Sequence, residues 1–160
     1  MAEPRTAERY AVVALFDRLD VGTTFSRRRW PAHVTLVSNF VTAASVDRIA
    51  EALRQAPGLD APLRIEFGGR AKFGPDRDIP VRLVLPGRIT ELHRHLVDEL
   101  VVLTDLKADE PAYWGEGYRP HLTLGASVDE GDGEPRMTTD VAIARLDGDL
   151  ANVVAVIASA

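Results

Sequence analysis

The sequence contains no cysteine and no apolar run near the roughly twenty residues that a membrane-spanning helix needs. The absence of cysteine excludes disulfide bonds, thiolate nucleophiles and cysteine-ligated zinc. The N-terminal residues also lack the basic and apolar stretches of a secretory signal peptide. We therefore expect a cytoplasmic protein with no membrane span.

Positive charge is also in deficit. The 24 acidic residues outnumber the 19 basic ones, which gives a formal net charge of −5. A protein that holds long nucleic acid needs many lysines and arginines over one face, so we expect no extended nucleic-acid surface. Basic residues do cluster at Arg27 to Arg29, which form either a solvated turn or a patch that attracts an anionic substrate. Acidic residues concentrate farther along the chain, at Asp129, Glu130, Asp132 and Glu134.

The chain contains the same short motif, which is typical of a β-strand, at two places. Residues 31–36 read Pro-Ala-His-Val-Thr-Leu, and residues 119–124 read Arg-Pro-His-Leu-Thr-Leu. Average residue usage gives a His-x-Thr-Leu tetrad at roughly one position in ten thousand, so two copies in a chain of this length are not expected by chance. The copies lie about half the chain length apart, as a duplication would leave them.

Each copy offers an imidazole beside a hydroxyl on one face of a strand. Because side chains alternate along a strand, His33 and Thr35 point the same way, and His121 and Thr123 repeat the arrangement. A single His-x-Thr is usually an ordinary half-buried pair, but two copies brought together would surround one phosphate. We therefore predict that His33 and His121 are catalytic. Thr35 and Thr123 are predicted to bind the substrate.

Three residues beside the motifs are further candidates for substrate binding. Arg119 precedes its histidine by two positions, so on an extended strand its guanidinium would share the cleft face and clamp a phosphate. The alternative is a solvated loop arginine. Trp30 and Tyr118 each stand three residues before a motif histidine and could stack on a nucleobase, although packing at the core or rim is the other interpretation.

The sequence does not predict a metal site. His93 and His95 lie two positions apart on a predicted helix, so they face different directions and are expected to be exposed rather than metal-ligating. Acid-base catalysis by two imidazoles, one taking up a proton and the other giving one, requires neither a metal nor a cofactor.

The first half of the sequence predicts several strands and one helix. Residues 10–16 are continuously apolar and of strand length, which indicates a central strand. The first motif strand is expected to continue to Phe40. Ser45 is the predicted N-cap of a helix of about a dozen residues that Pro57-Gly58 ends. Further strands are predicted at residues 62–67 and 81–85.

The second half predicts another helix and a hairpin. The helix is indicated by an apolar face made up of Ile89, Leu92, Leu96, Leu100 and Leu103. Asp147-Gly148 predicts a turn between strands at 141–146 and 152–158, with a short helix at 138–145 as the alternative. Residues 129–135 are acidic and glycine-containing where the first half has a helix, so the symmetry is broken there.

These elements predict a single α+β domain spanning residues 1–160. Hydrophobic residues make up 46% of the chain and charged residues 27%, as in ordinary globular proteins. We expect an internally duplicated, two-lobed fold with two antiparallel-rich sheets around a central cleft and helices outside. The pseudo-repeat halves would span about residues 8–80 and 81–160. We expect the protein to be a monomer.

The paired motifs resemble those of the two-histidine (2H) phosphoesterase superfamily, which includes the bacterial 2'-5' RNA ligase-like proteins and the cyclic nucleotide phosphodiesterases. That family carries two His-x-Thr/Ser motifs on pseudo-symmetric strands facing a cleft, here His33-Val34-Thr35 and His121-Leu122-Thr123. Residues 10–16 are similar to the family's opening strand, and residues 65–73 to its middle strand. The missing or shortened helix after the second motif departs from the family pattern and affects the rim of the cleft.

The resemblance implies metal-independent cleavage of a phosphodiester, usually a 2',3'-cyclic phosphate, or the reverse ligation. One histidine would act as base and the other as acid, and the sequence does not say which. We predict a hydrolase of the cyclic phosphodiesterase type that acts in RNA processing on a small cyclic-phosphate nucleotide or an RNA terminus. The alternatives are 2'-5' RNA ligase activity and a non-catalytic module that binds nucleotides or RNA ends.

Overall fold

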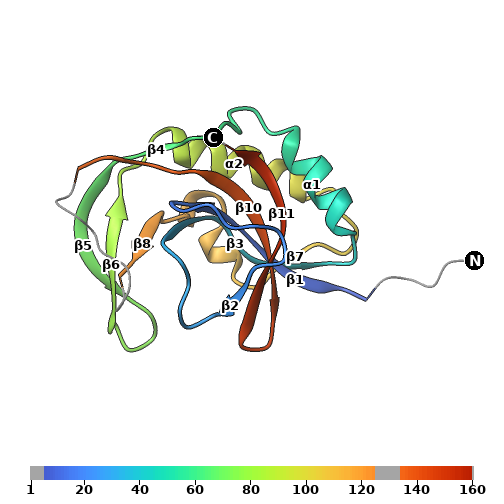
Figure 1. The fold of residues 1–160 in the computed structure, drawn as a ribbon, viewed down its shortest axis with the longest axis horizontal. Coiled ribbons are helices and arrows are strands. Elements are labelled where there is room, and N and C mark those ends of the chain that lie inside the picture. The colour runs from blue at the N-terminus through green and yellow to red at the C-terminus, as the bar shows by residue number, and fades with distance from the viewer. Residues whose placement is uncertain (1–5, 125–133, 160) are drawn as a thin grey trace, which may run out of the picture.

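Strand β1 (Glu8–Leu15) lies inside a large antiparallel sheet in the computed structural model, which describes residues 6–124 and 134–159 (Figure 1). It pairs with β3 (His33–Thr42) on one side and with β10 (Asp140–Asp147) on the other. Both faces of β1 are covered, since Val12 joins the main core and Val13 a second apolar cluster. The central strand predicted from its apolar run is therefore confirmed.

Nine strands form this sheet within the described residues, and their order interleaves the two halves of the sequence. The remaining strands are β2 (Thr24–Ser26), β4 (Arg64–Ile65), β5 (Phe67–Phe73), β6 (Ile79–Val84), β7 (Lys107–Ala108), β8 (His121–Thr123), β9 (Arg136–Met137) and β11 (Leu150–Ser159). The order is β2-β11-β10-β1-β3-β8-β6-β5, with β7 also paired to β3. Strands β4 and β9 form a separate two-stranded sheet.

The two motif strands, β3 and β8, are direct neighbours in the large sheet. They run antiparallel and pair Val34 with Leu122. In this register each motif histidine lies opposite the threonine of the other motif. Val34 and Leu122 are buried in the core, so the histidines and threonines belong to the opposite face. One residue pair thus brings both motifs to a single surface.

The α+β, two-lobed architecture predicted from the sequence is confirmed (Figure 1). Strands β5, β6 and β8 form one lobe, and β1, β2, β10 and β11 belong to the other. The sequence predicts two sheets, and the structure joins their strands into one path through the β3–β8 pair. Each lobe draws strands from both predicted sequence halves.

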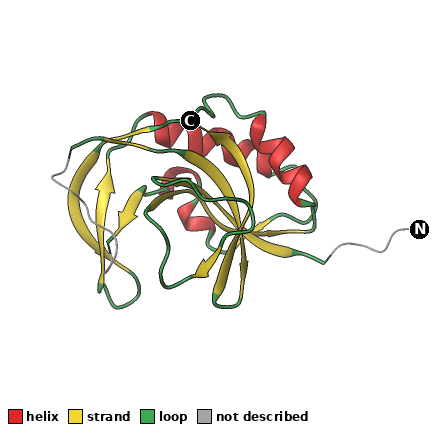
Figure 2. Ribbon diagram, viewed as in Figure 1, coloured by secondary structure: helices red, strands yellow, loops and turns green. Residues whose placement is uncertain are grey.

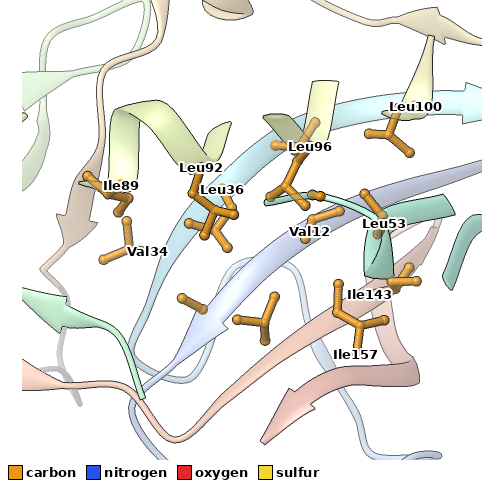
Figure 3. Close-up of a cluster of buried hydrophobic side chains, with 14 of the residues drawn as sticks. Val12, Val34, Leu36, Leu53, Ile89, Leu92, Leu96, Leu100, Ile143 and Ile157 are labelled. Atoms are coloured by element: carbon orange, nitrogen blue, oxygen red, sulfur yellow. The ribbon is translucent and has the colours of Figure 1, made fainter. Parts of the chain in front are cut away.

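The helices α1 (Val46–Arg54) and α2 (Arg88–Leu100) lie on the same side of the sheet and pack against each other (Figure 2). Helix α2 covers β3, and α1 covers β11. Figure 3 shows the apolar face of α2 over the inner residues of β1 and β3, among them Val34 and Leu36. The predicted apolar face is confirmed, because all five marker residues are buried: Ile89, Leu92, Leu96 and Leu100 within α2, and Leu103 just after the helix ends.

The structure confirms two further local predictions and corrects a third. Ser45 caps α1, since its Oγ accepts a hydrogen bond from the Arg48 amide at 3.2 Å. The turn at Asp147-Gly148 joins β10 to β11, with φ of 57° at Gly148, so the alternative helix at 138–145 is wrong. The strand expected at 62–67 is broken instead, because β4 pairs away with β9 and β5 pairs with β6.

Most of the segment after the second motif, residues 125–133, falls outside the described residues. The predicted break of symmetry at 129–135 therefore stays a prediction. No helix in the described part of the chain is long and apolar enough to cross a membrane.

His93 is buried in the core, so the prediction that it lies on the surface is wrong. Its Nδ1 donates to the Leu36 carbonyl of β3 at 2.6 Å, and its Nε2 accepts from the Gly115 amide at 2.9 Å. Its ring stacks on Tyr118 with 3.9 Å between centroids. An imidazole fits this apolar face because it satisfies two backbone groups that would otherwise be buried without partners.

The variant His93→Leu is expected to lower the free energy of unfolding by about 2 to 4 kcal/mol, since two backbone groups lose their partner inside the protein. The matched variant His95→Leu should cost less than about 1 kcal/mol, because that partly exposed ring has one hydrogen bond, to the Pro57 carbonyl. Urea unfolding followed by circular dichroism measures both. Equal losses would contradict the buried role of His93.

Candidate functional site

The two motif histidines are held in the same way. His33 Nδ1 lies 2.8 Å from the carbonyl oxygen of Pro31, and His121 Nδ1 lies 2.8 Å from that of Arg119. A carbonyl oxygen only accepts, so each Nδ1 carries a hydrogen and donates it. In each neutral ring Nε2 is then left with its lone pair, available to take up or pass on a proton.

An aromatic ring supports each imidazole. Trp30 lies against His33 with 4.6 Å between ring centroids, and Phe73 of β5 meets His121 edge-on at the same separation. The sequence places Trp30 and Tyr118 in equivalent positions, but in space Phe73 is the counterpart of Trp30. Both contacts restrict the orientation of the histidine rings.

Two adjoining cavities, of about 640 and 800 Å³, form a cleft over the paired motif strands. The larger contains His33, the smaller contains His121, and Thr35 and Asn39 line both. Every site residue predicted from the sequence lines one of them. His33, Thr35, Thr123 and Trp30 line the His33 cavity, and His121, Thr35, Arg119 and Tyr118 line the His121 cavity.

Irregularities in β3 explain why Asn39 reaches the cleft. The pairing of β1 with β3 shifts register twice between Tyr10 and Val13, so β3 carries extra residues. As a result Leu36 and Val37 are both buried, whereas Ser38 and Asn39 are both partly exposed and line the His121 cavity. Strict alternation cannot predict this, so sequence reasoning missed both polar residues.

Tyr118 is anchored beneath the cleft. Its hydroxyl donates to the carbonyl of Thr35 at 2.7 Å, and one face of its ring is covered by His93. The preceding 3₁₀ turns, η1 (Pro111–Tyr113) and η2 (Gly115–Gly117), need glycine, because a Cβ on Gly117 would overlap the Ala112 carbonyl. Tyr118 therefore links β3 to this segment and supports Thr35 from behind.

Arg119 lies at the mouth of the His121 cavity, where its guanidinium sits 4.7 Å above the Phe73 ring. Lys72 and Arg77 add positive charge to the same cavity, and Glu110 is the acidic residue that lines it. Tyr113 also lines this cavity, with half of its side chain exposed. Apart from Arg119, these residues come from the end of β5, the β5–β6 turn, and η1 with its N-cap. Those segments lie far from the motifs in sequence and carry no pattern that would have marked them.

Burial controls the protonation of both histidines. It lowers the pKa of His33 from 6.5 to about 4, although the hydrogen bond to Pro31 opposes the shift, and the neighbouring His121 lowers it further. The pKa of His121 is also lowered, first by burial and then by the charge of Arg119. Both imidazoles are therefore neutral at neutral pH when no anion is bound.

The described residues contain no group of three or more histidine, aspartate or glutamate side chains that could hold a metal ion. His93 is engaged with backbone groups through both ring nitrogens. Among the described residues of the cleft, cationic side chains outnumber the carboxylates of Glu110 and Asp78, and imidazoles and hydroxyls lie beside them, which suits an anionic ligand.

A sequence model of the 2'-5' RNA ligase superfamily matches residues 7–151. The chain therefore belongs to the 2'-5' RNA ligase superfamily, whose members are 2H phosphoesterases, and the recognition made from the two motifs is confirmed. The sequence matches no curated protein.

Solved structures share the fold at low sequence identity. E. coli LigT, crystallised with 3'-AMP, matches with a TM-score of 0.53 and 12% identity, over 94% of this chain and 97% of its own. A structure described as a phosphoesterase matches with a TM-score of 0.52 and 10% identity, over 92% of this chain and 94% of its own. At such identities the likeness concerns the fold.

The lowered pKa of His33 should make the protein less stable as the pH falls. Between about pH 7 and pH 5 the unfolded chain takes up a proton at this position that the folded chain does not bind, which should remove about 2 kcal/mol. The variant His33→Asn should therefore lose less stability over this interval than the wild type, as urea unfolding at both pH values would measure. An identical loss in both proteins would contradict a partly buried His33 that is neutral in the folded protein.

Proposed function

We propose that this protein is a metal-independent phosphodiesterase that hydrolyses 2',3'-cyclic phosphates of nucleotides or RNA ends. The observation that carries the proposal is the arrangement of two imidazoles, each with Nδ1 tied to a backbone carbonyl, in adjoining cavities that share Thr35. Membership in the 2'-5' RNA ligase superfamily supports it. The proposal also accounts for the positive charge that gathers around the cleft of an acidic protein.

In the proposed reaction His33 is the base and His121 the acid. His33 has a pKa of about 4 and is neutral, so its Nε2 can take a proton from the attacking water. The water oxygen bonds to phosphorus, and the bond from phosphorus to one ribose oxygen breaks. Protonated His121 gives its Nε2 proton to that departing oxygen, and a 2'- or 3'-phosphate monoester results. The bound phosphate anion raises the pKa of His121 and keeps it protonated for this step.

The threonine hydroxyls have a separate role. Thr35 and Thr123 flank the histidines on the same face of the paired strands, where they can donate hydrogen bonds to non-bridging phosphate oxygens. Negative charge builds up on those oxygens as water attacks. Donors held by a β-sheet stabilise it without having to reorganise during the reaction.

The nucleoside would occupy the His121 cavity. This cavity offers the exposed ring of Tyr113, on which a nucleobase can stack, together with Asn39 for polar contacts. Trp30 and Tyr118, the aromatic residues favoured from the sequence, are already packed against histidine rings. The binding of 3'-AMP by E. coli LigT, which shares this fold, is consistent with a nucleotide ligand.

Ligation is the reverse of the same proton transfers, so the histidines serve either direction. The formal net charge of −5 favours hydrolysis of a small substrate over joining of two long RNA strands. A module that binds nucleotides without turning them over remains the alternative of a different class.

Each of the variants His33→Ala and His121→Ala is expected to lower kcat/KM for a 2',3'-cyclic mononucleotide by at least about a hundredfold, since each removes one proton-transfer group. The assay separates the 2'- and 3'-phosphate products by chromatography and is run with EDTA, which should leave wild-type turnover unchanged. His95→Ala, on the outer face of the molecule, is the matched control and should retain wild-type activity.

Unchanged turnover in either motif variant would overturn the mechanism, as would activity lost in EDTA and restored by a divalent ion. Binding without any product by the wild type, weakened in Thr35→Ala and Thr123→Ala, would favour the binding module.

The two kinetic constants should also differ in their pH dependence. In the free protein the pKa values of both histidines are lowered, so the bell-shaped profile of kcat/KM should peak on the acid side of about pH 6.5. In the complex the phosphate raises the pKa of the acid, so the kcat profile should extend to higher pH. Initial rates from about pH 4 to pH 9 measure both profiles. Coincident profiles would contradict two partly buried histidines of lowered pKa, one of which the substrate re-protonates.

A further inference from the structure

The turn that carries Arg27 to Arg29 is anchored beside His33. The Arg27 amide donates to the Asp149 carbonyl at 2.8 Å, and the Arg29 amide donates to the Ser26 carbonyl at 2.9 Å. The Arg28 amide is bound by Ser26 Oγ, and β2 itself pairs with β11. The backbone that presents the three guanidinium groups is thus held in place before any ligand arrives, which lowers the entropic cost of binding one.

The three arginines line the His33 cavity, and few carboxylates of the described residues are near enough to neutralise their charge. One donor of Arg27 bonds the Gly148 carbonyl at 3.0 Å, and no carboxylate in the described part of the chain pairs with its positive charge. Arg28 and Arg29 are exposed and form no ion pair with residues 6–124 or 134–159. Among the described residues that line this cavity, Asp78 is the one carboxylate. The three arginines therefore outnumber this carboxylate, and the excess positive charge favours binding of an anionic group of the ligand.

We propose that Arg27, Arg28 and Arg29 form a subsite for a phosphate on the 5' carbon of the nucleotide whose 2',3'-cyclic phosphate reacts. This inference rests on the proposed function. The preferred substrate is then a nucleotide with phosphates at both ends of its ribose, rather than a cyclic mononucleotide with a free 5' hydroxyl. One guanidinium group can donate two parallel hydrogen bonds to the oxygens of a phosphate. Three such groups match the double negative charge of a phosphate monoester.

The geometry of ribose supports this placement. The base leaves the sugar at C1' and the 5' carbon leaves it at C4', on opposite sides of the ring oxygen. With the cyclic phosphate over the shared Thr35 and the base in the aromatic His121 cavity, the 5' carbon points toward the other cavity. Both cavities carry cationic side chains, but the aromatic ones gather in the His121 cavity, which has Phe73, Tyr113 and Tyr118 against Trp30 alone among the described residues of the His33 cavity. The base therefore fits the His121 cavity, and the three arginines of the other cavity are left for the 5'-phosphate.

The test compares a nucleoside 2',3'-cyclic phosphate with the same compound carrying a 5'-phosphate. The wild type should show a kcat/KM at least about tenfold higher for the 5'-phosphorylated compound, the effect of one or two charge-assisted hydrogen bonds. The double variant Arg28→Ala/Arg29→Ala should lose this preference, and added salt should weaken it in the wild type. The control Arg48→Ala/Arg94→Ala removes the same charge from the outer helices, away from both cavities, and should keep the preference.

A third substrate identifies the source of the 5'-phosphate. A dinucleotide that ends in a 2',3'-cyclic phosphate carries a diester at that position, as an RNA end does. Higher kcat/KM for the dinucleotide than for the 5'-phosphorylated mononucleotide indicates RNA ends, and the reverse order indicates free nucleotides. Both orders support the subsite, provided that Arg28→Ala/Arg29→Ala abolishes the gain.

Binding measurements separate failure of the subsite from failure of the proposed function. Calorimetry compares a nucleoside 3',5'-bisphosphate with the nucleoside 3'-monophosphate. Tighter binding of the bisphosphate by the wild type, lost in Arg28→Ala/Arg29→Ala, supports the subsite even if no cyclic phosphate is hydrolysed. Hydrolysis without any preference for a 5'-phosphate, together with equal affinities for the two ligands, overturns the subsite and leaves the proposed function standing.

Discussion

The pairing of Val34 with Leu122 is the contact on which the cleft depends. It joins β3 to β8 and so connects the strands of the two lobes into one sheet. Both residues are buried beneath the helices, which fixes the register, since a slip by one position would turn the motif histidines into the core and two apolar side chains outward. The hydrophobic packing of α2 on β3 therefore places the polar chemistry on the other face (Figure 3).

Around this symmetric centre the two cavities are built differently. Each histidine has the same backbone hydrogen bond, but Trp30 from the turn before β3 packs on His33, and Phe73 of β5, in the same lobe as β8, packs on His121. The His121 side gains Tyr113 and Arg119, whereas the His33 side gains the three-arginine turn. A substrate with two unlike ends is the natural ligand of such a cleft, because each end finds a surface of its own chemistry.

Histidine serves two purposes in this protein, and whether Nε2 is already bonded to the backbone decides which. His93 has both ring nitrogens bonded to backbone groups of β3 and η2, so it stabilises the segment that carries Tyr118 and exchanges no proton. His33 and His121 use only Nδ1 in this way, which leaves Nε2 available. Their burial lowers their pKa values and costs stability when they are protonated, and a bound phosphate anion offsets that cost. Binding and protonation of the site are therefore linked.

The sequence by itself determined the central strand, the Ser45 cap, the apolar face of α2, the hairpin at Asp147-Gly148 and the two His-x-Thr motifs, because each rests on local periodicity or turn chemistry. It also brought seven candidate residues to attention, and all seven line the cleft. Only the tertiary structure decided that β3 pairs with β8, that the bulges of β3 expose Ser38 and Asn39, and that His93 is buried. Those outcomes depend on contacts between residues far apart in the chain, which no local pattern encodes.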